Sequence, residues 1–179
     1  MLKTIALSGA GLLALAIVVV LVMATAKPDI FRVQRSVSIK AAPEKIFPLI
    51  DDLHVSMTWS PYEDKDPAMK RSHGGPRSGK GAFYEWDGNK EVGSGRLTIT
   101  ESAAPTKVVM ALDMTRPFEC HNIVEYTLAP QGDATVVTWA MQGPAPFIAK
   151  VMQVFFNMDK MVGRDFEAGL ASLKAMAES

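Results

Sequence analysis

The longest patterned stretch of the sequence lies at its C-terminal end. Between Phe147 and Ala177, hydrophobic residues recur every three or four positions, and most polar residues fall between them. This spacing gathers hydrophobic side chains on one face of an α-helix. The pattern therefore predicts one long amphipathic helix, whose apolar face the rest of the chain must cover. Its hydrophobic positions are Ile148, Val151, Met152, Phe155, Met158, Val162, Phe166, Leu170, Leu173 and Met176.

Most of the segments before this helix alternate hydrophobic and polar residues, which is typical of strands with one covered face. A short helix is expected after the first strand, because Ala42-Pro43-Glu44 is typical of a helix N-terminus. A long irregular connection follows at 51–81. The order strand, helix, five strands, helix predicts an α+β fold with a six-stranded antiparallel sheet packed on the C-terminal helix. The expected strands are 31–40, 82–86, 93–101, 107–114, 119–128 and 135–141.

The N-terminal segment differs in character from the rest. Residues 5–23 carry no charge and are mostly Leu, Ile, Val and Ala. A helix of that length rises about 28 Å, close to the thickness of the hydrocarbon core of a bilayer. The sequence therefore predicts a single-pass transmembrane anchor within residues 1–27, followed by one domain at 28–179.

Two questions about this segment stay open. A cleaved signal peptide is the alternative to an anchor, because Lys3 precedes the apolar run and Ala24-Thr25-Ala26 has the form of a cleavage site. The membrane side of the domain is undetermined as well. Basic residues after the segment favour a cytoplasmic domain by simple counting, but most of them belong to a predicted strand.

Composition excludes several classes of function. The chain has 19 basic and 19 acidic residues, so no nucleic-acid partner is expected. The three histidines lack metal-ligand spacing, and Cys120 is the only cysteine. Residues 74–80 match the start of a phosphate-binding loop, but Gly81 replaces the required Ser or Thr and a strand follows. No metal and no cofactor are therefore expected.

The alternation also assigns faces to particular polar side chains. If Val124 and Leu128 point toward the covered face, Asn122 and Tyr126 do so too. Arg35 shares the covered face of the first strand, and a buried arginine requires a partner. The candidates considered are a carboxylate, such as Asp113 or Glu85, or a bound ligand.

Several short stretches resemble the START-like, or SRPBCC, superfamily, in particular its polyketide cyclase/dehydrase and lipid-transport branch. The resemblance covers about residues 30–177. Members have the helix-grip fold, in which a curved antiparallel sheet wraps around the C-terminal helix and encloses an apolar cavity. The resemblance implies no universal catalytic residue, so the catalytic residues stay unassigned. It is carried by Arg35-Ser36-Val37, Ala42-Pro43-Glu44-Lys45-Ile46-Phe47, Trp59-Ser60-Pro61, Gly81-Ala82-Phe83-Tyr84-Glu85-Trp86, Thr135-Val136-Val137-Thr138-Trp139 and Phe166-Glu167-Ala168-Gly169-Leu170.

Face assignment and resemblance together predict a ligand cavity between the sheet and the helix. The expected function is membrane-anchored binding or transport of a hydrophobic small molecule or lipid. A cyclase-like enzyme acting on a hydrophobic substrate is one alternative. A protein-interaction module that presents Trp59 and Tyr62 is another, and a solid core would leave no cavity at all. The expected lining residues are Tyr84, Trp86, Met110, Leu112, Asn122, Tyr126, Trp139 and Met141 of the sheet, with Phe155, Met158 and Val162 of the helix.

Overall fold

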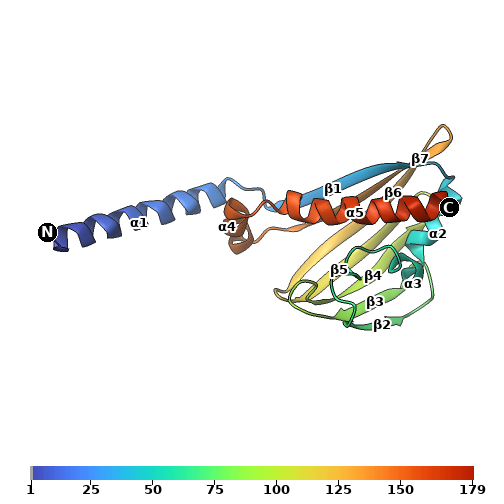
Figure 1. Cartoon of the computed structure of the whole chain (residues 1–179), viewed down its shortest axis with the longest axis horizontal. Helices are drawn as coiled ribbons and strands as arrows, with labels where there is room; N and C mark the ends of the chain where they lie inside the picture. Colours follow the sequence, from blue (N-terminus) through green and yellow to red (C-terminus); the bar gives the residue numbers. More distant parts are fainter. Residues whose placement is uncertain (1) are drawn as a thin grey trace.

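A computed structural model describes the backbone of residues 2–179 and the side chains from Gly11 onward. A helix at the N-terminus leads into a sheet, and two further helices close the chain (Figure 1). The helices are α1 (Leu2–Thr25), α2 (Pro43–Asp51), α3 (Leu53–Ser56), α4 (Phe147–Phe155) and α5 (Met158–Glu178). The strands are β1 (Ile30–Ile39), β2 (Lys70–Gly74), β3 (Phe83–Asp87), β4 (Ser94–Ala103), β5 (Lys107–Arg116), β6 (Cys120–Gln131) and β7 (Ala134–Pro144).

The sheet is antiparallel throughout, with the order β1-β7-β6-β5-β4-β3-β2. It has seven strands, so the expectation of six was wrong. The additional strand, β2, lies inside the connection that the sequence left irregular and pairs with β3 at the edge of the sheet. Its first four residues, Lys70 to His73, are exposed on both faces. A strand with no buried face has no hydrophobic alternation, which is why the pattern did not reveal it.

The C-terminal helix is divided, so the single helix expected from Phe147 to Ala177 was also wrong. Phe156 has an extended backbone, with φ −120° and ψ 129°, and ends α4. Asn157 then caps α5, because its side chain accepts a hydrogen bond from the Lys160 amide at 2.9 Å. Asparagine is among the best N-cap residues, and Asp159 adds a favourable charge in the first turn. Asn157 and Asp159 are therefore typical of a helix start. Because the hydrophobic spacing continues across them, the sequence nevertheless predicted one unbroken helix.

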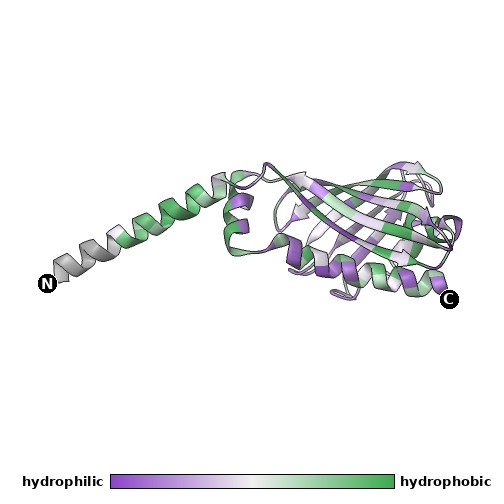
Figure 2. Cartoon of the chain, turned by 90° about the horizontal axis from the view of Figure 1, so that it is seen from above, coloured by the Kyte–Doolittle hydropathy of each residue, from purple (hydrophilic) through white to green (hydrophobic). Residues whose placement is uncertain are grey.

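The core lies between the sheet and α5, which runs beside β1 and packs on the concave side of the sheet (Figures 1 and 2). Phe166, Leu170 and Leu173 of α5 are almost fully buried. They meet Val33 and Ile39 of β1 in one hydrophobic cluster, as the face assignment of both elements predicted. The wrapped sheet and its C-terminal helix form the helix-grip arrangement.

The N-terminal helix α1 extends away from the sheet, and its C-terminal end contacts α4 (Figure 1). In the part of the chain that the structure describes, no helix is hydrophobic over a length that would span a bilayer. The predicted span starts at residue 5, and side chains before Gly11 lie outside the described part. The transmembrane anchor is thus not supported by the described residues and stays a prediction.

Candidate ligand-binding cavity

A cavity of about 280 Å³ lies between the sheet and α5, close to the lower limit of about 300 Å³ for common ligand pockets. The inward faces of β3 to β7 form its floor, because period-two alternation turns every second side chain toward α5. Phe166 is the residue of α5 in its lining. Most of the lining is hydrophobic, so the space is suited to an apolar guest.

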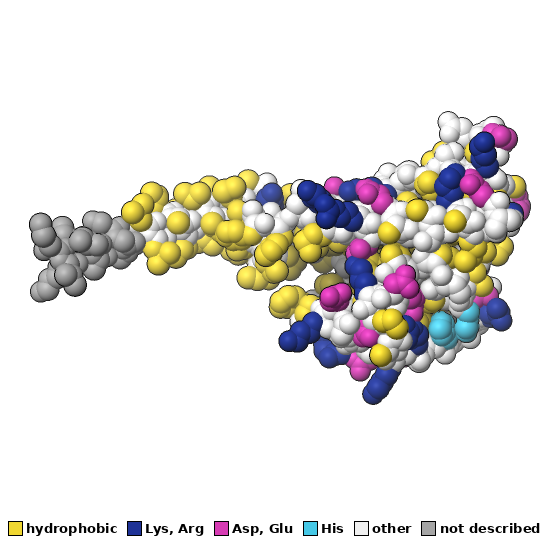
Figure 3. Space-filling view, in the orientation of Figure 1, with side chains coloured by type: hydrophobic (Ala, Val, Ile, Leu, Met, Phe, Trp, Pro, Cys, Tyr) yellow, Lys and Arg dark blue, Asp and Glu magenta, His cyan; other side chains and the backbone are white. Residues whose placement is uncertain are grey.

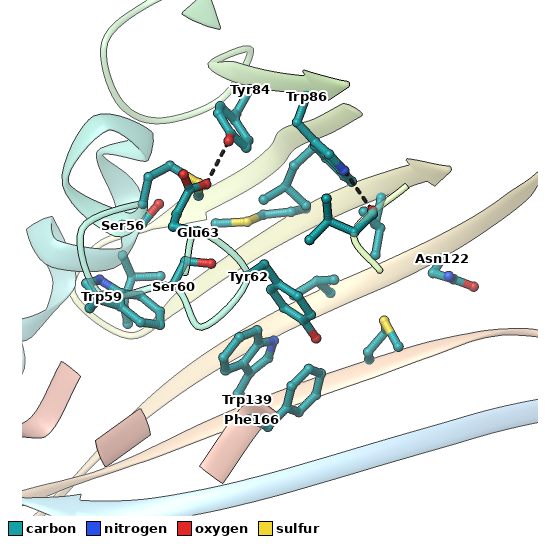
Figure 4. A pocket seen from close by; sticks show the side chains of 18 of the residues that line it. Ser56, Trp59, Ser60, Tyr62, Glu63, Tyr84, Trp86, Asn122, Trp139 and Phe166 are labelled. Carbon is teal, nitrogen blue, oxygen red and sulfur yellow. Dashed lines mark hydrogen bonds between the residues drawn. The ribbon is translucent and has the colours of Figure 1, made fainter. Parts of the chain in front are cut away.

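The connection between α3 and β2 closes one side of the cavity. Trp59 is buried, and its Nε1 donates to the backbone oxygen of Leu49 at 2.8 Å, which holds the indole against α2. Tyr62 is half-buried and lines the same space. Both side chains turn inward (Figure 4). The alternative of a protein-interaction module, which needed Trp59 and Tyr62 exposed, is therefore wrong for these two residues.

Trp139 of β7 is the central aromatic residue of the cavity wall. Its ring stacks on Phe166 with 4.0 Å between ring centroids, and it meets Tyr126 at 5.1 Å and Trp59 at 5.9 Å. Gly169 permits this close approach, since a Cβ there would meet the Trp139 ring at 2.8 Å. Figure 4 shows Tyr62, Trp139 and Phe166 together at the α5 side of the space.

Two buried polar atoms of the lining have no hydrogen-bond partner among the described residues. They are Nε1 of Trp139 and Oδ1 of Asn122. Buried polar groups are nearly always paired, so each such group calls for an explanation. Asn122 Oδ1 lies against the backbone of Gly143, where any Cβ would collide with it. The Trp139 N–H, by contrast, belongs to the aromatic cluster in the cavity wall and is a donor without an acceptor.

A polar chain crosses the β2–β3 side of the cavity. The Tyr84 hydroxyl donates to Glu63 Oε1 at 2.7 Å, and Arg71 Nε donates to Glu63 Oε2 at 2.6 Å. Both carboxylate oxygens are therefore engaged. Burial, followed by the hydrogen bond to Glu63, raises the pKa of Tyr84 well above its usual value. This chain holds the 59–69 connection against the sheet, and Tyr84 stays protonated at neutral pH.

Two further phenols border the cavity. Burial raises the pKa of Tyr62 and of Tyr126, with smaller contributions from Asp165 to Tyr62 and from Tyr62 to Tyr126. Both groups therefore stay neutral at physiological pH. A neutral phenol can donate a hydrogen bond, but it is a poor general base.

The eight sheet residues expected to line the cavity all do so: Tyr84, Trp86, Met110, Leu112, Asn122, Tyr126, Trp139 and Met141. The three expected helix residues do not. Phe155 and Met158 are exposed because the helix breaks between them, and Val162 packs against the core outside the lining. Phe166 takes their place. The hydrophobic spacing placed Phe166 on the correct face of the helix, but Phe166 was not among the residues expected to line the cavity.

Sequence reasoning missed a second group of lining residues. Tyr62, Glu63 and Met69 come from the connection at 51–81, which has no periodicity from which an inward face could be deduced. Trp59 was predicted neither to line the cavity nor to be buried; it was named as part of the Trp59-Ser60-Pro61 motif and as an exposed residue of an interaction module. The features of the sequence that pointed to its burial were its large side chain and Pro61, two positions later.

Arg35 lies on the covered face of β1, as predicted, but its expected partners were wrong. Its guanidinium contacts Asp159 at 3.0 Å and Glu167 at 2.7 Å, both from α5. Asp113 instead pairs with His121, and Glu85 with Arg96, on the outer face of the sheet. The arginine therefore joins strand to helix and takes no part in the cavity.

Comparison with known proteins agrees with this architecture. The family model described as polyketide cyclase/dehydrase and lipid transport matches residues 31–178. The chain belongs to this family. No curated protein sequence matches it.

Solved structures show the same fold in distant proteins. A protein from Chromobacterium violaceum is 14% identical, with a TM-score of 0.60, over 86% of this chain and 99% of that one. Ginseng major latex-like protein 151 from Panax ginseng is 10% identical, with a TM-score of 0.58, over 85% and 100% of the two chains. At such identities the likeness concerns the fold alone. Together with the family, it establishes the helix-grip fold of this domain.

Proposed function

We propose that this protein binds or carries a hydrophobic small molecule or lipid in the cavity between its sheet and α5. The observation that carries the proposal is an apolar cavity whose wall includes the unpartnered N–H of Trp139. Pockets of this type combine apolar walls with a few polar groups that orient the ligand. The ligand would therefore present a hydrogen-bond acceptor to Trp139 and apolar surface elsewhere.

Membrane anchoring by the N-terminal segment is part of the same proposal. It is supported by the uncharged run at residues 5–23 and by the exposed hydrophobic side chains of α1 from Leu12 to Met23. An anchored carrier would take its ligand from, or deliver it to, the membrane in which it sits.

The test is a comparison of two ligands of equal shape, an aryl ketone and the matching hydrocarbon. Each would displace an apolar fluorescent dye from the full chain in lipid nanodiscs. Trp139→Phe keeps an aromatic ring but removes the donor, so ketone affinity should fall about fivefold, the equivalent of one neutral hydrogen bond of about 1 kcal/mol. Affinity for the hydrocarbon should stay within twofold, a change too small to count as a lost hydrogen bond.

Thr138→Ser is the matched control, because residue 138 points to the opposite face of β7. Both ligands should bind this variant as they bind the natural chain. Absence of saturable dye binding by the natural chain would refute the proposal. An equal loss of both ligands in Trp139→Phe would refute the role of the indole N–H.

A further inference from the structure

Exposed hydrophobic side chains gather on α4 and just after it. Among the described residues outside α1, seven of the ten exposed large hydrophobic side chains lie between residues 147 and 161. Five belong to α4 and the residue after it: Phe147, Ile148, Met152, Phe155 and Phe156, here called the α4 surface. Their exposed fractions run from 43% for Met152 to 69% for Ile148. A contiguous patch of this kind marks an interaction site.

Helix α4 is held next to the end of α1. Lys150 of α4 pairs with Asp29 at 2.5 Å, and the Ala145 amide donates to the Asp29 backbone oxygen at 2.7 Å. Asp29 lies in the short link between α1 and β1. In Figure 3 the hydrophobic side chains along α1 continue over α4 without a polar break. The α4 surface is thus an extension of the apolar surface of α1.

Basic residues predominate around the α4 surface. The sequence from 143 to 164 contains one acidic residue, Asp159, and Arg35 forms an ion pair with it. Lys160 and Arg164 are exposed just beyond the break, and Arg32 is exposed on the neighbouring β1. Apolar side chains bordered by basic ones fit the interface of a bilayer that contains anionic lipids.

The opening of the cavity lies at the end of the sheet from which β7 leads into α4. Glu91 is the exposed residue of the cavity lining, and Met114, one of several half-buried lining residues, comes from the end of β5. Both lie where β3, β5 and β7 end and where β4 and β6 begin. The chain passes from that end of β7 directly into α4 (Figure 1). A hollow in the same region is visible below the start of α5 (Figure 3).

From these observations we infer that the α4 surface docks on the lipid bilayer beside α1 and turns the open end of the cavity toward the membrane. The inference has two halves, the docking of the α4 surface and the turning of the open end toward the membrane. The second half rests on the proposed function, since a route to the membrane matters only if the cavity holds a ligand. Docking itself requires no ligand. The two halves therefore have separate tests.

Docking is tested on the full chain with Cys120→Ser, reconstituted in vesicles of phosphatidylcholine and phosphatidylglycerol that carry spin-labelled lipid. A fluorophore is attached through Phe155→Cys, and in a second sample through Asp133→Cys at the opposite end of the sheet. We expect the spin-labelled lipid to quench the label at 155 strongly and the label at 133 weakly. Equal weak quenching at both positions would overturn the inference. The inference would also be overturned if the fluorescence of the label at position 155 changed with protein concentration but not with the spin-labelled lipid. That result would indicate that a second copy of the chain covers the α4 surface.

The route of the ligand is tested by transfer of an apolar fluorescent probe from donor vesicles to the protein. Ile148→Asp with Phe155→Asp should slow transfer several-fold while leaving equilibrium affinity for the probe unchanged, because neither residue lines the cavity. Ala129→Asp with Gln131→Asp adds the same charge at the other end of β6 and should leave the transfer rate unchanged. An unchanged rate in the α4 variant overturns the route. Failure of probe binding in every sample refutes the proposed function, with docking still decided by quenching.

Discussion

At the scale of single residues, the contact between Arg35 and Gly163 shows how β1 and α5 are fastened. The guanidinium of Arg35 lies against α5 and donates to Asp159 and Glu167, and the hydrogen bond with Arg35 holds the pKa of Asp159 below its usual value. A Cβ on residue 163 would collide with that guanidinium. Glycine is therefore required for close approach at this position, despite its poor helix propensity.

This contact predicts a reversal of sign in a double-mutant cycle. Gly163→Ala alone should destabilise the protein by about 1–3 kcal/mol, because the new methyl displaces the guanidinium from its carboxylates. In an Arg35→Ala background the same change should stabilise by about 1 kcal/mol, the helix propensity of alanine over glycine. Denaturation of the full chain in nanodiscs measures both. Destabilisation in both backgrounds would mean that something other than Arg35 requires the glycine.

At the scale of elements, the break at Phe156 divides the C-terminal segment into two helices with different roles. The buried residues of α5 hold the helix on the sheet, whereas no residue of α4 is buried. Phe166, Leu170 and Leu173 belong to the apolar face that the hydrophobic spacing predicted, and their burial confirms that face for α5. The pattern of spacing alone could not show that the first half leaves the sheet.

The division predicts opposite results for two phenylalanines. Phe166→Ala should cost about 3–5 kcal/mol of unfolding free energy, because it removes a buried ring stacked on Trp139. Phe155→Ala should change that free energy by less than about 0.5 kcal/mol, since the side chain is 65% exposed. Chemical denaturation measures both. A large loss for Phe155→Ala would show that α4 is part of the folded core.

At the scale of the whole molecule, the sequence predicted those elements whose hydrophobic and polar residues follow a regular period. Period-two alternation determines which side chains face α5, so the eight sheet residues predicted from it all line the cavity. Leu97, Met114 and Val124 share the same alternation and line the cavity as well, although they were not among the expected residues. Elements without a buried face, such as β2, leave no periodic signal. Pairings across the fold, such as Arg35 with Asp159 and Glu167, depend on which elements meet, and alternation along one strand carries no such information.

The cavity has a further consequence, which concerns volume. Unfolding eliminates internal voids, so pressure favours the unfolded chain in proportion to the void that the fold encloses. An apolar cavity of about 280 Å³ next to the main helix, even with one open end, should therefore lower the pressure at which the protein unfolds. A guest that fills this space should raise the midpoint pressure, as high-pressure fluorescence of the tryptophans would report. If a bound ligand left that pressure unchanged, it would be occupying some other part of the molecule.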